Sequence, residues 1–567
     1  MDPSHRTRCQ SPRWWTARFQ QTSNAARHES QHTDSVSPPL PVLAPVHELT
    51  SAHSPPPPPY EDIIDLEKAL HLAPEKESDQ YALRPVLADS PPLPPSKAKL
   101  RQQQHPALHG HLRAVRHFRY TVFSVYRRLF TFVFLLNTIG LYMLVCQCTS
   151  HVPTSVLLNT LATLASSNYL LAILVRQDYL VNLLFRAAWL VPWNVPLAIR
   201  KVVARVYCYG GLHSGAAVAG TIWWLVFTIS MTWLFLQDSI YPFPIIVITW
   251  ILLVLLTSIL ILSLPGLRTK YHNAFEQTHR FLGWISILLF WMQFLLLLHH
   301  VSTATGRSLC EALIHNPTFW NLIAITIALA YPWLHLRRWT FTAHPLSSHA
   351  LRLSFSNAVH KFSCVSISTS PLREWHPFAT FPFADTRQPG ASMVISSAGD
   401  WTNSVIRQAL MRQNIQTDIT KKHGIHAQAP FEMTFWVKSH PKPGVLSLSC
   451  LFPRVVILTT GSGIAPSLSS LLDRPRSQFA RLIWSTRAPL QTYGQHMMDL
   501  VQQADADALV MDTSEMGRPD LLEVAWQMYK QVNAEAVFVL SNAAVTKMVV
   551  GRLEQRGVPV FGPIWDS

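Results

Sequence analysis

The sequence has few charged residues for its length. Asp, Glu, Lys and Arg make up 14% of its 567 residues, whereas soluble domains carry about 25%. Apolar residues fill the difference: they make up 49% of the chain and include 19 Trp and 27 Phe. This composition argues against a fully soluble enzyme, and at about 150 residues per domain the length allows about three or four domains.

Cysteine is also scarce. The seven cysteines are scattered without C-x-x-C spacing, which argues against a disulfide framework and against a cysteine-based zinc site. The start of the chain lacks the short apolar run of a secretory signal peptide. The formal net charge of +15 would favour nucleic acid in a soluble protein, but the positions of the basic residues favour a membrane instead.

Residues 1–112 are rich in Pro, Ser, Gln and His and show no sustained apolar periodicity. Such a segment cannot bury enough apolar surface to offset its chain entropy, so we expect a disordered arm. Within it, Pro57–Tyr60 reads Pro-Pro-Pro-Tyr, a polyproline sequence of the kind that the aromatic groove of a WW domain binds. A stiff, solvated linker is the alternative interpretation.

Residues 113–339 contain six apolar runs, each about long enough to cross a hydrocarbon layer of about 30 Å. The runs lie near residues 129–146, 155–175, 215–236, 244–264, 281–298 and 319–334. Lys and Arg, including Arg200 and Arg205, gather before the first run and in alternate connections, whereas Arg307 alone lies in the opposite loops. This pattern predicts six transmembrane helices with both termini cytosolic, in contact with membrane lipid and not with nucleic acid. The mixed segment 180–205 is expected to form an interfacial helix.

After the last apolar run the pattern changes. Leu351–Phe355 and Cys364–Ser368 alternate apolar and polar residues with a period of two, as half-buried strands do. From about Phe452 onward, apolar strands alternate with helical stretches. We therefore expect a β-barrel domain over residues 340–448 and an α/β domain over residues 449–567.

The clearest local motif lies in the expected α/β domain. An apolar strand, Val456–Leu458, runs into the loop Gly461–Gly463 and then into a helix that begins near Pro466. Glycines let a pyrophosphate approach the backbone, and the helix N-terminus supplies free N–H groups. A tight turn is the alternative explanation. Arg487 follows the next strand, where a 2′-phosphate would lie, and it favours NADPH unless it is an ordinary surface residue.

Four short motifs resemble, in the same order, those of the ferric reductase and NADPH oxidase superfamily. They are Trp375-His376-Pro377-Phe378-Ala379, Gly399-Asp400-Trp401-Thr402, Gly461-Ser462-Gly463-Ile464-Ala465-Pro466 and Gly517-Arg518-Pro519. More narrowly, Glu374–Phe378 and the C-terminal Gly562–Ser567 resemble fungal TmpA-type membrane flavoproteins. In related fungal and plant proteins a similar module is fused to an adenylate-forming enzyme.

For FAD, the resemblance assigns one strand. His376, Pro377 and Phe378 would form a rigid extended segment whose backbone and ring contact the isoalloxazine of FAD. The family's hydroxyl, which hydrogen-bonds the flavin, is replaced by Ala379, and Thr380 follows one residue late. The resemblance therefore implies the fold more firmly than it implies the flavin contacts.

For NADPH and hydride transfer, the resemblance assigns the glycine loop with Pro466, together with Arg518 of the Gly-Arg-Pro motif. Trp565 would cover the flavin face and move aside for the nicotinamide, and packing on the barrel is its alternative role. Ser541 replaces the cysteine of the family's Cys-Gly, and Ser396 replaces the arginine that holds the FAD phosphates. Both replacements leave the geometry of hydride transfer open.

The family also carries two haems, each held by one histidine from the third helix and one from the fifth. Here His213 and His279 open the third and fifth apolar helices at matching depth. They would serve as ligands of one b-type haem, or else bind headgroups or backbone carbonyls. Nearly four turns further on, or about 14 residues, Phe227, Met292 and Gln293 replace the outer ligands. We expect one haem or none, and no electron transfer across the membrane.

Two functions remain open. The first is an integral membrane oxidoreductase, in the plasma membrane or an endomembrane, that takes hydride from NADPH onto FAD. It would pass electrons to a small-molecule acceptor in the cytosol or membrane, in fungal secondary metabolism or development. The second is a regulatory or redox-sensing membrane flavoprotein with little turnover. The glycine loop and Trp565 favour the first function, whereas Ala379 and Ser396 favour the second.

Overall fold

The computed structural model describes residues 114–115, 118–148, 153–383, 390–422, 431–438 and 440–564. All of these residues belong to one compact unit of the chain, residues 94–567. The Pro57–Tyr60 motif, the expected disordered arm and Trp565 lie outside the described residues.

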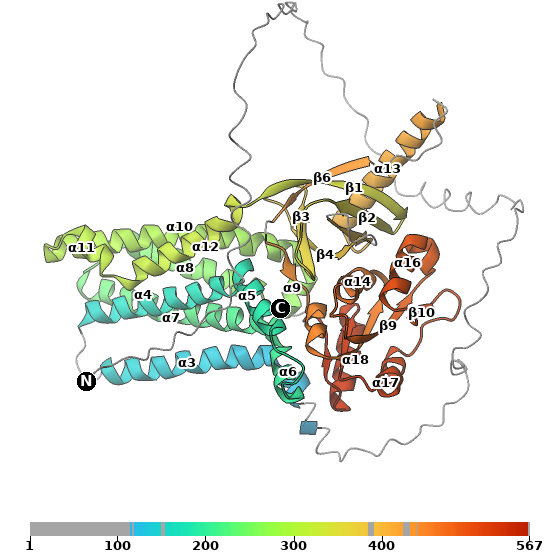
Figure 1. Ribbon diagram of the computed structural model, residues 1–567. Coiled ribbons are helices and arrows are strands. Elements are labelled where there is room, and N and C mark those ends of the chain that lie inside the picture. Colours follow the sequence, from blue (N-terminus) through green and yellow to red (C-terminus); the bar gives the residue numbers. More distant parts are fainter. Residues whose placement is uncertain are drawn as a thin grey trace, which may run out of the picture. The chain divides into compact units, whose positions relative to one another are not determined.

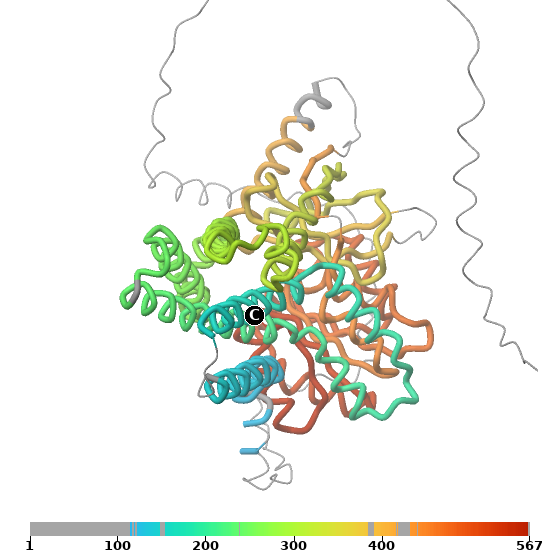
Figure 2. The backbone as a smooth tube through the Cα atoms, turned by 90° about the vertical axis from the view of Figure 1, so that its left-hand side faces the viewer, coloured from blue at the N-terminus to red at the C-terminus, as the bar shows by residue number. Residues whose placement is uncertain are grey.

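Long apolar helices form the first part of the described chain (Figure 1). They are α3 (Val125–Cys148), α4 (Thr154–Leu174), α7 (Gly210–Asp238), α8 (Phe243–Leu262), α10 (His272–Thr305) and α12 (Pro317–Leu334), with the short helices η2 (Phe118–Val122), α9 (Pro265–Lys270) and α11 (Leu309–Ile314). Figure 2 shows the long helices nearly along their axes. Within the described residues, six helices are long and apolar enough to cross a membrane. The expected number of apolar helices is confirmed, and the crossing itself stays a prediction.

Glycines let α7 approach its neighbours closely. A Cβ added at Gly215 would lie 2.9 Å from the carbonyl oxygen of Phe130 in α3, and one added at Gly220 would lie 3.2 Å from the ring of Tyr169 in α4. Small residues at such contacts allow helix backbones to pack closely where lipid removes the hydrophobic driving force. Helix α7 therefore lies at the centre of the described helices, in contact with α3, α4 and α8.

Two short helices, α5 (Asp178–Trp189) and α6 (Leu197–Val203), connect α4 to α7 through η3 (Val206–Tyr209). On α5, the side chains of Val181, Phe185 and Ala188 are at most 4% exposed and share a core with residues of the α/β domain. Part of the apolar surface of this segment therefore lies against protein, whereas Leu183, Leu190 and Val202 are 62%, 81% and 73% exposed. The expected interfacial position stays a prediction.

An antiparallel sheet follows α12. Its strands are β1 (Arg337–Ser347), β2 (Ala350–Phe355), β3 (Ser363–Ser368), β4 (His376–Pro382), β5 (Ala391–Ser396), β6 (Phe431–Val437) and β7 (Lys442–Pro443). The strand order is β4-β5-β2-β1-β6-β3-β7, and β4 also pairs with β3. Six of these strands therefore close into a barrel, which removes most open strand edges and confirms the expected barrel. Leu353 and Ile395 inside it are 0% exposed, and Ile406 of helix α13 (Asp400–Lys422) joins their core.

A parallel sheet forms the last part of the chain. Its strands are β8 (Arg454–Thr460), β9 (Phe479–Thr486), β10 (Leu509–Asp512), β11 (Ala536–Leu540) and β12 (Val560–Phe561), in the order β10-β9-β8-β11-β12. Its helices are η4 (Val445–Leu451), η5 (Gly461–Gly463), α14 (Ile464–Leu472), α15 (Pro489–Tyr493), α16 (Gln495–Ala504), α17 (Leu521–Gln531) and α18 (Ala543–Gln555). Helices α14 and α16 pack on one face of the sheet, and α17 and α18 on the other. The expected α/β domain is confirmed.

Two arginines of the connection before α7 bind the α/β domain. Arg200 is 4% exposed, and it donates hydrogen bonds to Glu535 at 2.6 Å and to the carbonyl of Leu451 at 3.0 Å. Arg205 donates to Glu554 at 2.6 Å. The sequence pattern had placed both arginines among the charges that face lipid headgroups. The structure instead pairs both with carboxylates of the α/β domain.

The Arg205–Glu554 pair leads to a prediction about stability. Glu554 is 6% exposed, and burial raises the pKa of its carboxyl more than Arg205 lowers it. The substitution Arg205→Met leaves this buried carboxyl without its partner. We expect the free energy of unfolding to fall by about 3 kcal/mol, measured by chemical denaturation of the detergent-solubilised protein.

The double variant Arg205→Met with Glu554→Gln should recover most of that loss, because it removes the buried charge as well as its partner. Arg556→Met is a matched control. Its ion pair with Glu523 spans 3.7 Å and both side chains are about a third exposed, so we expect a loss below about 1 kcal/mol. Equal losses in the single and the double variant would contradict the role of the ion pair.

Candidate functional site

The carboxyl edge of the parallel sheet gathers residues that the sequence assigned to NADPH. Strands β8 and β11 are neighbours at the point where the strand order reverses, which is where sheets of this type bind ligands. Thr460 ends β8 and Ser541 directly follows β11, and their hydroxyls share a hydrogen bond of 2.6 Å. The loop Gly461–Gly463 begins at the next residue. Ser541 therefore lies beside the start of this loop.

The two glycines of the loop meet different structural requirements. Gly461 has a φ of +49°, in the left-handed region, and an added Cβ would have one described neighbour within 4 Å, the Tyr493 hydroxyl at 3.9 Å. A Cβ added at Gly463 would overlap the side chain of Thr459 and lie 2.9 Å from the carbonyl oxygen of Leu540. The space that a pyrophosphate needs is therefore beside Gly461, and Gly463 is required for packing against β11.

The other residues assigned to NADPH lie nearby. Pro466 is the third residue of α14 and is half-buried, while Ser485 at the end of β9 is 6% exposed. Arg487 directly follows β9, and Arg518 lies in the connection after β10. Both arginine side chains are exposed, and neither forms an ion pair with a described residue. They are free to meet an anion at this edge of the sheet.

The residues assigned to the flavin lie on β4, where side chains alternate between two faces. Phe381 shares a buried core with α14 of the α/β domain, so Pro377 and Ala379 lie on this same face of the strand. Thr380 points to the opposite face. It is 3% exposed and its hydroxyl donates to the carbonyl of Ser363 at 3.0 Å. Strand alternation therefore keeps Thr380 from supplying the hydroxyl that Ala379 lacks.

Two of the sequence motifs touch at β4. The ring of His376 stacks on Trp401 with 4.1 Å between the centroids, and Phe378 stacks on the same indole at 6.1 Å. His376 Nε2 and Trp401 Nε1 are buried without a hydrogen-bond partner among the described residues. Burial lowers the pKa of His376, so its imidazole is neutral at pH 7. Buried polar atoms are usually hydrogen-bonded. A ligand with polar groups at this position would supply the missing hydrogen-bond partners.

Tyr493 joins the barrel to the α/β domain at the same place. It is 4% exposed, and its ring meets that of Trp484 edge-on at 5.3 Å. Its hydroxyl faces Ser396 of β5 and Thr486 of β9, close to Gly461. Sequence reasoning did not identify this residue, because nothing in its neighbourhood distinguishes it from an ordinary core tyrosine. The barrel motif and the nucleotide loop thus share one domain interface.

His213 and His279 face each other at the start of α7 and in the first third of α10. Their ring centroids are 6.1 Å apart and their planes differ by 24°. A metal between two imidazole nitrogens needs about 2 Å on each side, which this separation allows. His213 Nδ1 lies 2.8 Å from the carbonyl oxygen of Ala172. That contact orients the ring as a haem ligand requires. It would equally satisfy the hydrogen-bonding need of a histidine that has only a structural role.

Side chains fill the level at which the ferric reductase family would hold its outer haem. Phe227 is 0% exposed and stacks on Trp224 with 4.8 Å between the ring centroids. Gln293 is 3% exposed, and its amide donates to the Thr249 hydroxyl at 3.5 Å. Met292 is 42% exposed and so lies away from the buried face of α10. The described side chains at this level pack against each other and present no imidazole.

Arg280, the residue after His279, binds the segment before β4. Its guanidinium donates to the carbonyls of Leu372 and Arg373 at 2.9 Å and 2.8 Å and pairs with Glu276 on the same helix. The histidine end of α10 is therefore held beside the strand that carries the flavin motif.

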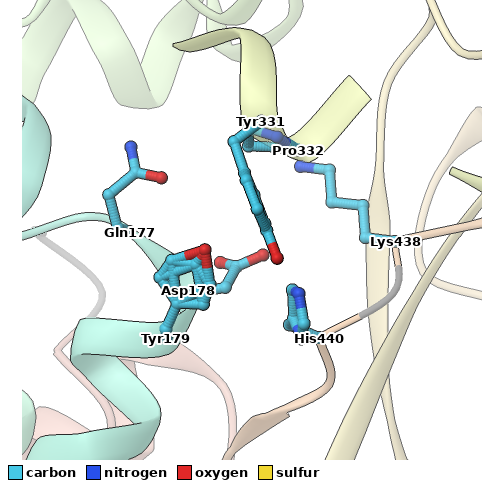
Figure 3. A pocket seen from close by; sticks show the side chains of 7 residues that line it. All are labelled: Gln177, Asp178, Tyr179, Tyr331, Pro332, Lys438 and His440. Atoms are coloured by element: carbon cyan, nitrogen blue, oxygen red, sulfur yellow. The ribbon is translucent and has the colours of Figure 1, made fainter. Parts of the chain in front are cut away.

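A polar cluster that sequence reasoning missed lies where α5 and α12 meet the barrel (Figure 3). A cavity of about 10 Å³ is lined by Gln177, Asp178, Tyr179, Tyr331, Pro332, Lys438 and His440. Asp178 pairs with Lys442 at 3.0 Å, and burial lowers the pKa of Lys438 to about 8. The cavity has room for about one water molecule. The cluster therefore attaches the barrel to the helices and is too small for a cofactor.

Known proteins resemble most of the chain. Residues 445–567 match the family "Adenylate-forming reductase 03009, C-terminal domain". Over 456 residues, or 80% of the chain, the sequence is 34% identical to Adenylate-forming reductase 03009 of Coprinopsis cinerea. Over 457 residues it is 35% identical to Adenylate-forming reductase 06235 of the same organism. The chain spans 41% of the length of each of these curated relatives. The expected similarity to adenylate-forming proteins is confirmed.

Two solved structures are also similar. One is a ferredoxin NADP+ reductase from Neisseria gonorrhoeae with bound FAD and NADP, at 15% identity and a TM-score of 0.28, covering 40% of this chain and 98% of its own. The other is a flavohemoglobin from Malassezia yamatoensis with bound FAD and heme, at 12% identity and a TM-score of 0.30, covering 72% of this chain and 97% of its own. Because these TM-scores are low, the fold assignment rests on the strand order alone.

The two loop glycines lead to opposite predictions for stability. Gly463→Val should lower the free energy of unfolding by about 3 kcal/mol or more, because the new side chain overlaps Thr459 and the backbone of β11. Gly461→Ala should cost only about 1 kcal/mol, because its methyl group enters open space and only the left-handed backbone is strained. Thermal unfolding of the two purified variants measures the difference. Similar losses in both would contradict the assigned roles.

Proposed function

We propose that this chain is a membrane-bound flavin oxidoreductase that takes hydride from NADPH onto FAD and passes electrons to a cytosolic or intramembrane acceptor. One observation carries the proposal: β4, with His376–Thr380, packs on α14, the helix that follows the Gly461–Gly463 loop. A flavin held on β4 and a nicotinamide held by the loop would meet at one domain interface. Hydride transfer depends on holding its two reactants in such proximity.

Residues on both faces of β4 fit the two nucleotides. His376 Nε2 and Trp401 Nε1, on the face of β4 that points away from α14, are buried polar atoms to which a bound flavin would offer partners. The open space beside Gly461, with the hydroxyls of Thr460 and Ser541, would take the pyrophosphate and nicotinamide of NADPH. When bound, FAD supplies the chemistry of accepting hydride and releasing electrons. The chain's own residues orient the two nucleotides and exclude water from the interface.

The relatives support a reductase activity. Both Coprinopsis cinerea proteins are named reductases, and the matched family is the C-terminal domain of one of them. Because the chain spans 41% of their length, the activities of their remaining parts are not assigned to it. The narrower proposals, a TmpA-type flavoprotein and ferric reductase-like chemistry, rest on the sequence motifs alone.

The helices support an acceptor within the membrane. Arg280 holds α10 beside β4, and the separation of His213 and His279 suits one b-type haem at the cytosolic end. Phe227 and Gln293 occupy the outer level. We therefore propose at most one haem per chain, and electron delivery that stays on the cytosolic side.

The proposed setting is the plasma membrane or an endomembrane, with six spans, both termini cytosolic and no nucleic-acid partner. Large apolar side chains of the long helices, such as Leu236, Leu288 and Ile327, are 73%, 70% and 61% exposed. Lipid would cover such residues. A WW-domain protein remains the proposed partner of Pro57–Tyr60.

A regulatory flavoprotein with little turnover is the second candidate. Ala379 offers no hydroxyl on the face of β4 that meets the α/β domain, and Ser396 offers no cation for a phosphate. These two residues favour nucleotide binding with slow hydride transfer.

Anaerobic flavin reduction separates the two functions. NADPH should bleach the flavin absorbance of the purified full-length protein. Gly461→Ala should slow this reduction by about tenfold to a hundredfold, because its methyl group displaces the pyrophosphate, while the flavin content stays unchanged. Flavin that stays oxidised in the wild type would favour the regulatory function. A normal rate in the variant would place the nucleotide elsewhere.

Haem content gives a separate test. Reduced-minus-oxidised spectra of the purified protein should show one b-type haem per chain or none, and His213→Ala should remove any haem signal, because no other described imidazole stands opposite His279. Two haems per chain would contradict the proposal. Reduction of an impermeant extracellular iron chelate by intact cells would contradict it as well.

A further inference from the structure

The outer face of β1, β2 and β5 carries apolar and basic side chains next to each other. Ala350 and Val394 on this face are buried against the α/β domain, and Val394 pairs directly with Arg352 of β2. Arg352 also pairs with His344 of β1, and its Nε donates to the hydroxyl of Ser392 in β5 at 3.2 Å. Directly paired residues point to the same side of a sheet, with their Cβ atoms about 5 Å apart. The imidazole and the guanidinium therefore share the face that looks toward the α/β domain.

Arg352 is a half-buried cation without a counter-ion. Among the described residues, no carboxylate forms an ion pair with it, and its hydrogen bond to Ser392 uses Nε alone. Burial lowers the pKa of Arg352 below its ordinary value. Removing a guanidinium from water is costly unless an anion compensates the charge. Both Nη groups of Arg352 remain available to such an anion.

The α/β domain contributes a third basic side chain. His496, in the first turn of α16, is exposed and lies near enough to Arg352 and His344 for both to lower its pKa, and α15 just before it packs against β1. Asp499 is the carboxylate near His496, and it accepts a hydrogen bond from Gln495 at 2.8 Å. Burial and the nearby Arg352 lower the pKa of both histidines. Each is therefore neutral at pH 7 and can donate one N–H group.

We propose that Arg352, His344 and His496 bind a phosphate group of a dinucleotide between the barrel and the α/β domain. A guanidinium offers a planar fork of donors that matches phosphate oxygens, and each domain contributes one histidine near Arg352 that can donate an N–H group. Arg352 lies across from Val394 of β5, two residues along the strand from Ser396, or about 7 Å. A ligand that joins this site to the Gly461 loop is extended, as a dinucleotide is. The assignment of the phosphate to a dinucleotide rests on the proposed function.

The first experiment uses inorganic phosphate and needs no redox cofactor. Thermal unfolding of the full-length protein in detergent is compared in phosphate and in chloride at equal ionic strength, for wild type, Arg352→Met and the control Arg407→Met. Arg407 is exposed on α13. Phosphate should raise the Tm of wild type and control but not of Arg352→Met. In chloride, Arg352→Met should be at least as stable as wild type, because it removes a buried charge that lacks a partner.

The second experiment identifies the source of the phosphate. FAD is titrated into deflavinated protein, and NADPH and NADH are compared as ligands. If the phosphate belongs to FAD, Arg352→Met should weaken FAD binding by about tenfold to a hundredfold, the effect of losing a hydrogen bond to a charged group. If it is the 2′-phosphate of NADPH, the variant should lose NADPH affinity and keep NADH affinity, and Arg487→Ala should then have little effect. Either result supports the site.

Two results would overturn the proposal. One is a phosphate-induced rise in Tm that persists in Arg352→Met together with a lower Tm of this variant in chloride, which would make Arg352 a structural residue. The other is unchanged binding of phosphate, FAD and NADPH by the variant. An Arg352-dependent phosphate effect in a protein that binds neither FAD nor NADPH would instead refute the proposed function and leave the anion site in place.

Discussion

Two arginines, one buried and one half-buried, hold the helical part of this protein against its α/β domain. Arg200 and Arg205 lie in the connection from α4 to α7, and each binds a carboxylate and a backbone carbonyl across the interface. Guanidinium groups removed from water need this full set of partners, since a missing partner leaves a buried charge uncompensated. Because the arginines directly precede α7, they determine where the His213 end of that helix lies relative to the parallel sheet.

The barrel is attached to the same end of the helices by independent contacts. Arg280 of α10 binds the backbone before β4, and Lys442 after β6 pairs with Asp178 at the start of α5. The flavin motif on β4 therefore has the histidine end of α10 on one side and α14 on the other. Proximity between the proposed nucleotide site, the proposed flavin site and the helices is thus a property of the folded interface. It does not depend on a hinge or a linker to bring the parts together.

The helices, the barrel and the α/β domain could be predicted because the period of apolar residues reports which faces are buried. The partner of a buried face could not be predicted in the same way. The segment with Phe185 has the same amphipathic pattern whether lipid or protein covers it, and Arg200 fits the positive-inside rule as well as it fits a buried ion pair. The packing of Gly463 against β11 could not be predicted either, because the carbonyl of Leu540 behind it comes from a strand about 80 residues away along the chain. Tyr493 and the basic cluster belong to no motif and depend entirely on tertiary contacts.

The two departures from the family motifs have different physical consequences. A phosphate-binding cation can be moved from one strand to a neighbouring strand, because the side chains of paired residues lie together on one face. Arg352 on β2 is placed in this way beside the strand that lacks an arginine at Ser396. The hydroxyl missing at Ala379 cannot be replaced by Thr380, since adjacent residues of a strand point to opposite faces. The proposed site therefore retains groups suited to nucleotide phosphates and lacks a side-chain contact that would fix a flavin ring. The orientation of a bound ring would depend on packing against β4 and on its backbone. That combination is expected to affect the rate of hydride transfer more than the affinity for either nucleotide.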